Sequence, residues 1–293
     1  GDTAILSRLS YILEELSLCQ QAGGDGYLLP TICGRAIFEN VLDGNFKTSN
    51  PFIETPYDKC WEPVYVMNKI MLGLYQVYMR CDLLQAKEIL VKMADWFGYS
   101  VIDKLSHDDL QKLLVCEHGS INESFIDVYQ ITGEDYYKEI ALQLEKKLWE
   151  NATPMESGVG WHCGGGRPLA GLAHGSSGML MAYASLLKLK FCQEYIGKVQ
   201  CIIDYEDSLY SEQQGNWLDY RSQEKPRMMN AWCHGAPGIL LARLKLAEVM
   251  ADDLRIRSDI QRAAKALFTQ EAGAHICLCH GIAGNLMIMA RFL

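Results

Sequence analysis

The segment HGSSGMLMAYASLL, His174 to Leu187, decides the expected fold, because a His-Gly pair and small residues stand directly before an apolar run with helical spacing. The same arrangement recurs at intervals of about 50 residues, the length of two helices with their connections. It begins again at His118-Gly119, His234-Gly235 and His280-Gly281. The pattern predicts helical hairpins whose inner helices all start at one end of a ring. This is an all-α fold of the α/α toroid type, with about six helical hairpins. The alternative is that the small residues serve only the close packing of helices.

The composition is typical of a globular protein and argues against several functional classes. Of the 293 residues 49% are hydrophobic and 22% are charged, and the net charge is −9. A negative chain is poorly suited to nucleic acid or to an anionic membrane surface, and no apolar run approaches the ~20 residues of a membrane span. The 11 cysteines are an odd number without tight spacing, which is typical of reduced thiols. We therefore expect a cytoplasmic protein.

Two Cys-His-Gly triplets indicate a metal site. They lie in WCHGAPGILLARL, Trp232 to Leu244, and in CLCHGIAGNLMIMA, Cys277 to Ala290. Cys279 and His280 are adjacent at a turn and can both bind one ion, while Cys233 occupies the equivalent place one hairpin earlier. Two cysteines and one histidine suit a catalytic zinc ion, which has three protein ligands and one open position. The alternative is that the cysteines are buried and inert. Other candidate donors are Cys163, His174, His234 and Cys277.

Four segments in the second half of the chain carry a resemblance to a known family. They are GGGRPLAGLAHGSSGMLMAYASLL, YEDSLYSEQQGNWLDYRS, NAWCHGAPGILLARL and CLCHGIAGNL. In this order they resemble the lanthionine synthetase C-like (LanC-like) family, and in detail the cyclase domain of class II lanthipeptide synthetases, over about residues 140–293. The resemblance implies a zinc ion held by Cys233, Cys279 and His280, with the substrate thiol in the open position. It also implies that His174 is the catalytic histidine.

The resemblance implies a thioether-forming reaction, and the residue types agree with it. The family adds cysteine thiols to dehydroalanine or dehydrobutyrine in lanthipeptide precursors, and relatives in animals add glutathione. A thiol with a pKa of about 8.5 is mostly protonated at neutral pH, and zinc binding releases that proton. Attack on the β-carbon then gives an enolate that an imidazole can protonate. His174 is the candidate acid, and His234 is either a second candidate or a packing residue. The expected substrate is a peptide or a small thiol.

The first half carries a second resemblance. Its segments are LSRLSYILEELSLCQQAGGDGYL, PVYVMNKIMLGLYQVYMRCDLLQAKEILVKMADWF and EHGSINESFIDVYQITGEDYYKEIA. They resemble glycoside hydrolase family 127, the β-L-arabinofuranosidase type, over about residues 1–145. That family has an α/α6 barrel, so both resemblances imply the same architecture. Glu117 and His118 match its sugar-site segment, but the paired-cysteine motif that holds its nucleophile is missing from this chain.

Departures from both families keep three functions open. The LanC-like family usually has an aspartate where this chain has Val115, and Glu117 is the nearest carboxylate that could take a catalytic role. The first hypothesis is a zinc-dependent LanC-like enzyme. The second is a carbohydrate-active α/α-barrel glycoside hydrolase. The third is an inactive, zinc-stabilised binding or scaffold protein, or a chimera.

Three further features of the sequence carry expectations: the motif NWLDYR, Cys277 and the junction between the two halves of the chain. Trp217, Asp219 and Arg221 in NWLDYR are candidate substrate contacts, and a loop ion pair with a packed Trp is the alternative. We expect Cys277 to be a packing residue. The junction KKLWENATPME, residues 146–156, has no linker rich in Pro, Ser or Gly. We therefore expect one continuous ring over residues 1–293, in which a glycoside-hydrolase-127-like half (1–145) meets a LanC-like zinc-binding half (146–293).

Overall fold

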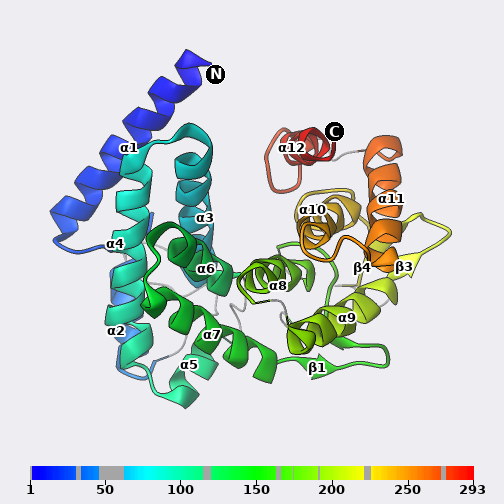
Figure 1. The fold of residues 1–293 in the computed structure, drawn as a ribbon, viewed down its shortest axis with the longest axis horizontal. Coiled ribbons are helices and arrows are strands. Elements are labelled where there is room, and N and C mark those ends of the chain that lie inside the picture. Colours follow the sequence, from blue (N-terminus) through cyan, green and yellow to red (C-terminus); the bar gives the residue numbers. More distant parts are fainter. Residues whose placement is uncertain are drawn as a thin grey trace. The chain divides into compact units, whose positions relative to one another are not determined.

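A computed structural model describes residues 2–30, 34–45, 63–114, 120–162, 166–173, 175–190, 192–220, 226–271 and 275–293. These residues form twelve α-helices and two small antiparallel sheets (Figure 1). The expected all-α class is confirmed, since the apolar runs that follow the four His-Gly pairs all lie mainly in helices. The chain divides into two compact units, Gly1–Glu150 and Asn151–Leu293. This boundary falls close to the expected junction, and the single continuous ring stays a prediction.

The described residues of the first unit form seven α-helices that pack against both sequence neighbours and more distant helices. Its helices are α1 (Thr3–Gly23), α2 (Gly34–Leu42), α3 (Pro63–Cys81), α4 (Leu84–Ser100), α5 (His107–Leu114), α6 (Ile121–Thr132) and α7 (Asp135–Glu150). Helix α3 packs on α4 and α6, α6 packs on α7, and α1 packs on α4. Phe38, Met67, Leu90, Phe97 and Phe125 fill the space between them and exclude water. Hairpins of this kind form because each helix buries one apolar stripe against its neighbour.

A buried amide joins two helices of the first unit. Asn68 on α3 donates through Nδ2 to the Ser120 carbonyl at 2.8 Å and to Ser124 Oγ at 2.9 Å, at the start of α6. Its side chain is fully buried. A buried amide is tolerated because its polar atoms are hydrogen-bonded. Asn68 therefore fixes the position of the α6 N-terminus against α3.

Helix α10 lies at the centre of the second unit. The helices of this unit are α8 (Ser177–Leu189), α9 (Gln193–Asp207), α10 (Ala236–Ala247), α11 (Leu254–Thr269) and α12 (Ile282–Phe292). Helix α10 contacts α8, α11 and α12, and it is buried on nearly all sides. Helices α8, α10 and α12 each begin just after a His-Gly pair, as the repeat predicts. The repeat therefore marks the starts of three neighbouring inner helices.

The described residues also form five short strands, which the all-α prediction did not include. They are β1 (Thr153–Pro154), β2 (Val159–Gly160), β3 (Tyr210–Ser211), β4 (Asn216–Asp219) and β5 (Arg227–Met228). Strand β1 pairs with β2, and β3, β4 and β5 form a sheet in that order. In the second sheet Tyr210 faces Trp217 and Leu218 faces Met228. Strands of two to four residues are too short to show a period-two pattern, which explains the omission.

None of the helices in the described ranges is both long and apolar enough to cross a membrane.

Candidate functional site: the meeting of the Cys-His-Gly turns

The two Cys-His-Gly turns lie side by side in the second unit. The backbone N–H of Cys233 donates to the carbonyl of Cys279 at 3.0 Å. On the other side, the carbonyl of Cys233 accepts a hydrogen bond of 3.2 Å from the N–H of Ala173, the residue before His174. The backbone thus joins the three segments that precede α8, α10 and α12. The expected gathering of these turns is observed within this unit.

Glycine is required at the third position of both triplets. Gly235 has a φ of 79°, and a Cβ built there would lie 1.8 Å from the Met229 carbonyl oxygen. A Cβ at Gly281 would lie 2.2 Å from the His275 carbonyl oxygen. No side chain fits at these distances, and the positive φ of Gly235 disfavours other residues independently. The glycine of each Cys-His-Gly triplet is therefore required by its turn, whereas the cysteine and the histidine are candidate ligands.

Buried amides hold the Cys233 turn in place. Asn216 Oδ1 accepts from the N–H groups of Trp217 and Ala236, both at 2.8 Å, so it caps the start of α10 from strand β4. Its Nδ2 donates to Gln270 Oε1 at 2.8 Å. Asn285 Nδ2 on α12 donates to the Asn230 carbonyl at 2.8 Å. Sequence analysis missed these amides. The available signal was an Asn inside the apolar start of α12 and another before Trp-Cys-His-Gly.

The candidate zinc ligands differ in exposure. Cys233 is 5% exposed, Cys279 is half-buried, and His280 is exposed with its ring edge-on to His275 at 5.4 Å between centroids. The donor types fit zinc, and the backbone hydrogen bond brings the two cysteines together. Within the described ranges, however, no group of three or more His, Cys, Asp or Glu side chains stands close enough to hold a metal ion. The zinc assignment therefore remains a proposal.

The other predicted site residues are either buried in the second unit or lie outside the described residues. His234 is buried, and its backbone N–H and C=O both bond to Ala231, at 3.2 and 3.1 Å. Trp217 is 1% exposed, and its ring packs edge-on against that of Tyr210 with 4.8 Å between the centroids. It is therefore a packed residue, which was the alternative to a substrate contact. Asp219 is buried at the end of β4, opposite Arg227. The candidates outside the described residues are Glu117, His118, Cys163, His174 and Arg221.

Cys277 corrects one expectation. It is exposed, so it is not the packing residue that the sequence analysis predicted. The segment from 275 to 281 turns back on itself, with the Ile282 N–H donating to the His275 carbonyl at 2.8 Å. A lone apolar sulfur in such a tight turn has no helix face against which to pack. This exposure depends on the geometry of the turn and therefore cannot be read from the sequence.

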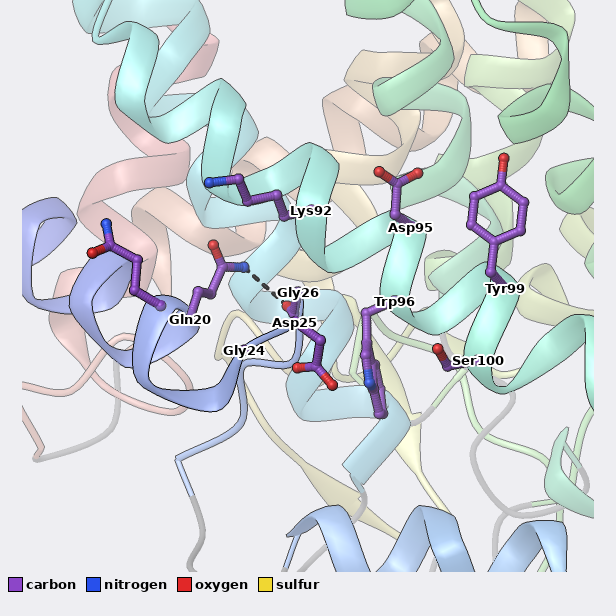
Figure 2. A pocket seen from close by; sticks show the side chains of 10 residues that line it. Gln20, Gly24, Asp25, Gly26, Lys92, Asp95, Trp96, Tyr99 and Ser100 are labelled. Atoms are coloured by element: carbon purple, nitrogen blue, oxygen red, sulfur yellow. Dashed lines mark hydrogen bonds between the residues drawn. The ribbon is translucent and has the colours of Figure 1, made fainter.

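The first unit contains a groove of about 560 Å³ that is separate from these turns (Figure 2). It lies between the C-terminal ends of α1 and α4 and is lined by Gln20, Gln21, Gly24, Asp25, Gly26, Lys92, Asp95, Trp96, Tyr99 and Ser100. Arg35 holds Asp25 through two hydrogen bonds of 2.6 and 2.9 Å, and this guanidinium keeps the pKa of the Asp25 carboxyl below its usual value. None of the predicted site residues that the structure describes lines this groove.

Two known protein families match parts of this chain. The model of the family described as lanthionine synthetase C-like protein matches residues 120–292, more than half of the chain. The chain belongs to the LanC-like family. Both Cys-His-Gly turns and helices α6 to α12 lie inside this match. The model of the β-L-arabinofuranosidase, GH127 catalytic domain matches residues 1–162, also more than half, so the chain belongs to that family through its first part.

Individual relatives agree with the LanC-like assignment. The chain is 28% identical over 133 residues to the lacticin 481/lactococcin biosynthesis protein LcnDR2 of Lactococcus lactis subsp. lactis. This match covers 42% of the chain but only 14% of that relative, so the chain spans a small part of the curated protein.

Solved structures confirm the fold class. A structure titled nisin cyclase matches with a TM-score of 0.54 and 16% identity over 88% of this chain and 68% of that one. The GH76A α-1,6-mannanase from Salegentibacter sp. HEL1_6 matches with a TM-score of 0.51 and 14% identity over 83% and 72%. Both are α/α toroid proteins, so the predicted fold type is confirmed. At these identities the likeness concerns the fold alone.

Proposed function

We propose that this LanC-like chain forms thioether bonds by adding a cysteine thiol to a dehydroalanine or dehydrobutyrine. The observation that carries the proposal is the hydrogen bond between the Cys233 N–H and the Cys279 carbonyl, which joins the two Cys-His-Gly turns. The substrate would be a lanthipeptide precursor or a small thiol such as glutathione. The LanC-like family match over 120–292 supports this reaction class.

The proposed cofactor is Zn²⁺, with Cys233, Cys279 and His280 as its ligands. A Cys₂His set is typical of catalytic zinc sites with one open position. The adjacent backbones of the two cysteines support this choice, and His280 follows Cys279 directly. Bound zinc would keep a substrate thiol in its thiolate form near neutral pH.

The other residues of the turns would handle charge and protons. When the sulfur bonds to the β-carbon, the π electrons of the dehydro residue move toward its carbonyl and give an enolate. The positive ends of the α10 and α12 helix dipoles would favour such a developing negative charge near the turns. The enolate α-carbon then takes one proton. His174, directly before the Gly175 turn, is the proposed acid, and buried His234 is the alternative.

The test is a dehydrated peptide that contains one free cysteine. Ring formation consumes the thiol at unchanged mass, so loss of thiol labelling without a mass change supports the proposal. The variant His174→Asn should lose turnover while keeping zinc, and His234→Asn should do so if His234 is the acid. Thiol loss at the uncatalysed rate, with peptide binding intact, would identify an inactive binding or scaffold protein instead.

A glycoside hydrolase is the second candidate. The GH127 match over residues 1–162 and the groove between α1 and α4 favour it, since Asp25 and Asp95 lie in that groove. Asp95 accepts a hydrogen bond of 2.7 Å from Tyr137 Oη, and Asp25 is paired with Arg35. Release of arabinose from an aryl arabinofuranoside, abolished by Asp95→Asn in the groove or by Glu117→Gln and unaffected by Cys279→Ala, would establish this activity in place of the cyclase.

A further inference from the structure

We infer that Asn285 is a positioning residue that holds the Cys279 turn against the Cys233 turn. This inference rests on the proposed function, in which both cysteines bind zinc. Asn285 lies in the first turn of α12, six residues after Cys279. Its Nδ2 donates to the carbonyl of Asn230, three residues before Cys233, at 2.8 Å. It thus reaches from one candidate ligand turn to the backbone of the other.

The Asn285 contact and the cysteine contact form a two-point clamp. One point is the backbone hydrogen bond between Cys233 and Cys279, and the other is the Asn285 side chain. The packing of α12 on α10 and the backbone hydrogen bond already bring the turns together, and the Asn285 contact adds a directional restraint several residues away. The relative position of the two cysteines therefore depends on the Asn285 amide. Metal sites bind tightly when their ligands are held in place before the ion arrives.

The chemistry of position 285 supports this role. Asn285 is 2% exposed on a helix whose other residues are almost all apolar. Its Oδ1 accepts no hydrogen bond from the part of the chain that the structure describes, so only its donor explains the presence of an amide. Burying an amide costs free energy, and an aliphatic side chain would be the favoured choice at this position if packing alone mattered.

Asn230 completes the connection to the rest of the unit. Its own Nδ2 donates to the carbonyls of Ala266 and Gln270, at 3.4 and 3.3 Å, at the end of α11. These hydrogen bonds therefore connect α12, through Asn285 and Asn230, to the end of α11. Both cysteine turns are thereby held in a defined position relative to α11.

The experiment compares Asn285→Ala with Asn68→Ala in the full chain. Asn68 is the matched control, because its Nδ2 also donates to a buried backbone carbonyl at 2.8 Å, but in the first unit. Zinc affinity is measured by competition with a chromophoric chelator. Hydrogen exchange of the Cys233 amide is measured in the metal-free protein. We expect Asn285→Ala to weaken zinc binding about tenfold or more, and Asn68→Ala to change it less than about twofold. We also expect faster exchange of the Cys233 amide only in Asn285→Ala.

Equal zinc affinity and equal Cys233 exchange in the two variants would overturn the clamp and leave Asn285 as an ordinary stabilising residue. If Asn285→Ala does not fold, Asn285→Ser replaces it in both measurements. If the unsubstituted protein binds no zinc, the proposed metal site fails, and the exchange of the Cys233 amide alone then decides whether the clamp exists. The two failures are therefore distinguishable.

Discussion

Arg243 and Glu206 form a fully buried ion pair in the second unit, with 2.8 Å between Arg243 Nη1 and Glu206 Oε2. Arg243 Nε also donates to Asp259 Oδ2 at 2.8 Å, and Ser177 Oγ donates to Glu206 Oε1 at 2.6 Å. Four helices, α8 to α11, therefore meet at one guanidinium. Burial raises the pKa of Glu206 although Arg243 opposes the shift. Because Ser177 lies in the turn after His174, this cluster also fixes the start of α8.

Replacing Arg243 should strongly destabilise the second unit. In Arg243→Met the carboxylates of Glu206 and Asp259 stay buried without their partner, which costs about 3–5 kcal/mol of the free energy of unfolding. The control is Arg257→Met, since the pair of Arg257 with Asp252 is exposed and such pairs contribute at most about 1 kcal/mol. Urea unfolding at pH 7 measures both. Similar losses in the two variants would contradict the central role of Arg243.

Asp207 should make the protein less stable as the pH rises. Burial, and next the charge of Asp259, raise its pKa from 3.8 to about 6. The folded state therefore binds the proton more tightly than the unfolded chain. This stabilising contribution is present below pH 3.8 and is lost as the pH rises through 6.

The variant Asp207→Asn tests this relation. At pH 8 its free energy of unfolding should exceed that of the unsubstituted protein, because the charged carboxylate is no longer buried. We expect a difference of about 1 kcal/mol, since Asp207 is only partly buried. At pH 4 the difference should shrink toward zero, since Asp207 is then protonated in the folded state. An advantage that stays constant between pH 4 and 8 would show that titration of Asp207 is not its cause.

The sequence predicted the helices and the meeting of the two Cys-His-Gly turns, because both follow from local periodicity and from a repeat. It could not predict the amides that hold the turns. Asn285 and Asn230 are joined across 55 residues, and no local pattern reveals such a partner. The placement of Trp217 was similarly inaccessible, since a Trp beside a polar loop motif suits a site and a core equally well. Arg243 within the apolar run GILLARL was the one polar residue whose buried partner could have been anticipated.

Gly235→Ala should disrupt the Cys233 turn. The added Cβ would meet the Met229 carbonyl oxygen at 1.8 Å at a φ of 79°, so the backbone must move. We expect a loss of more than about 2 kcal/mol in the free energy of unfolding and loss of zinc binding. Gly197→Ala is the matched control, because this position lies inside α9 with open space around it. That variant should gain about 0.5–1 kcal/mol from helix propensity. Equal stability of the two alanine variants would disprove the turn requirement.

Zinc content should distinguish the three cysteines of the two turns. We expect the purified protein to hold one zinc ion per chain, by the proposed Cys₂His set. Cys233→Ala and Cys279→Ala each remove a thiolate ligand and should lower the bound zinc to well below one equivalent. Cys277→Ala removes an exposed thiol two residues from Cys279 and should leave the zinc content unchanged. Metal analysis after gel filtration measures all three. Retention of zinc in Cys279→Ala would contradict the ligand assignment, and its loss in Cys277→Ala would move the site to the exposed sulfur. Because the three residues share one residue type in neighbouring turns, the comparison separates metal ligation from a general effect of removing a cysteine.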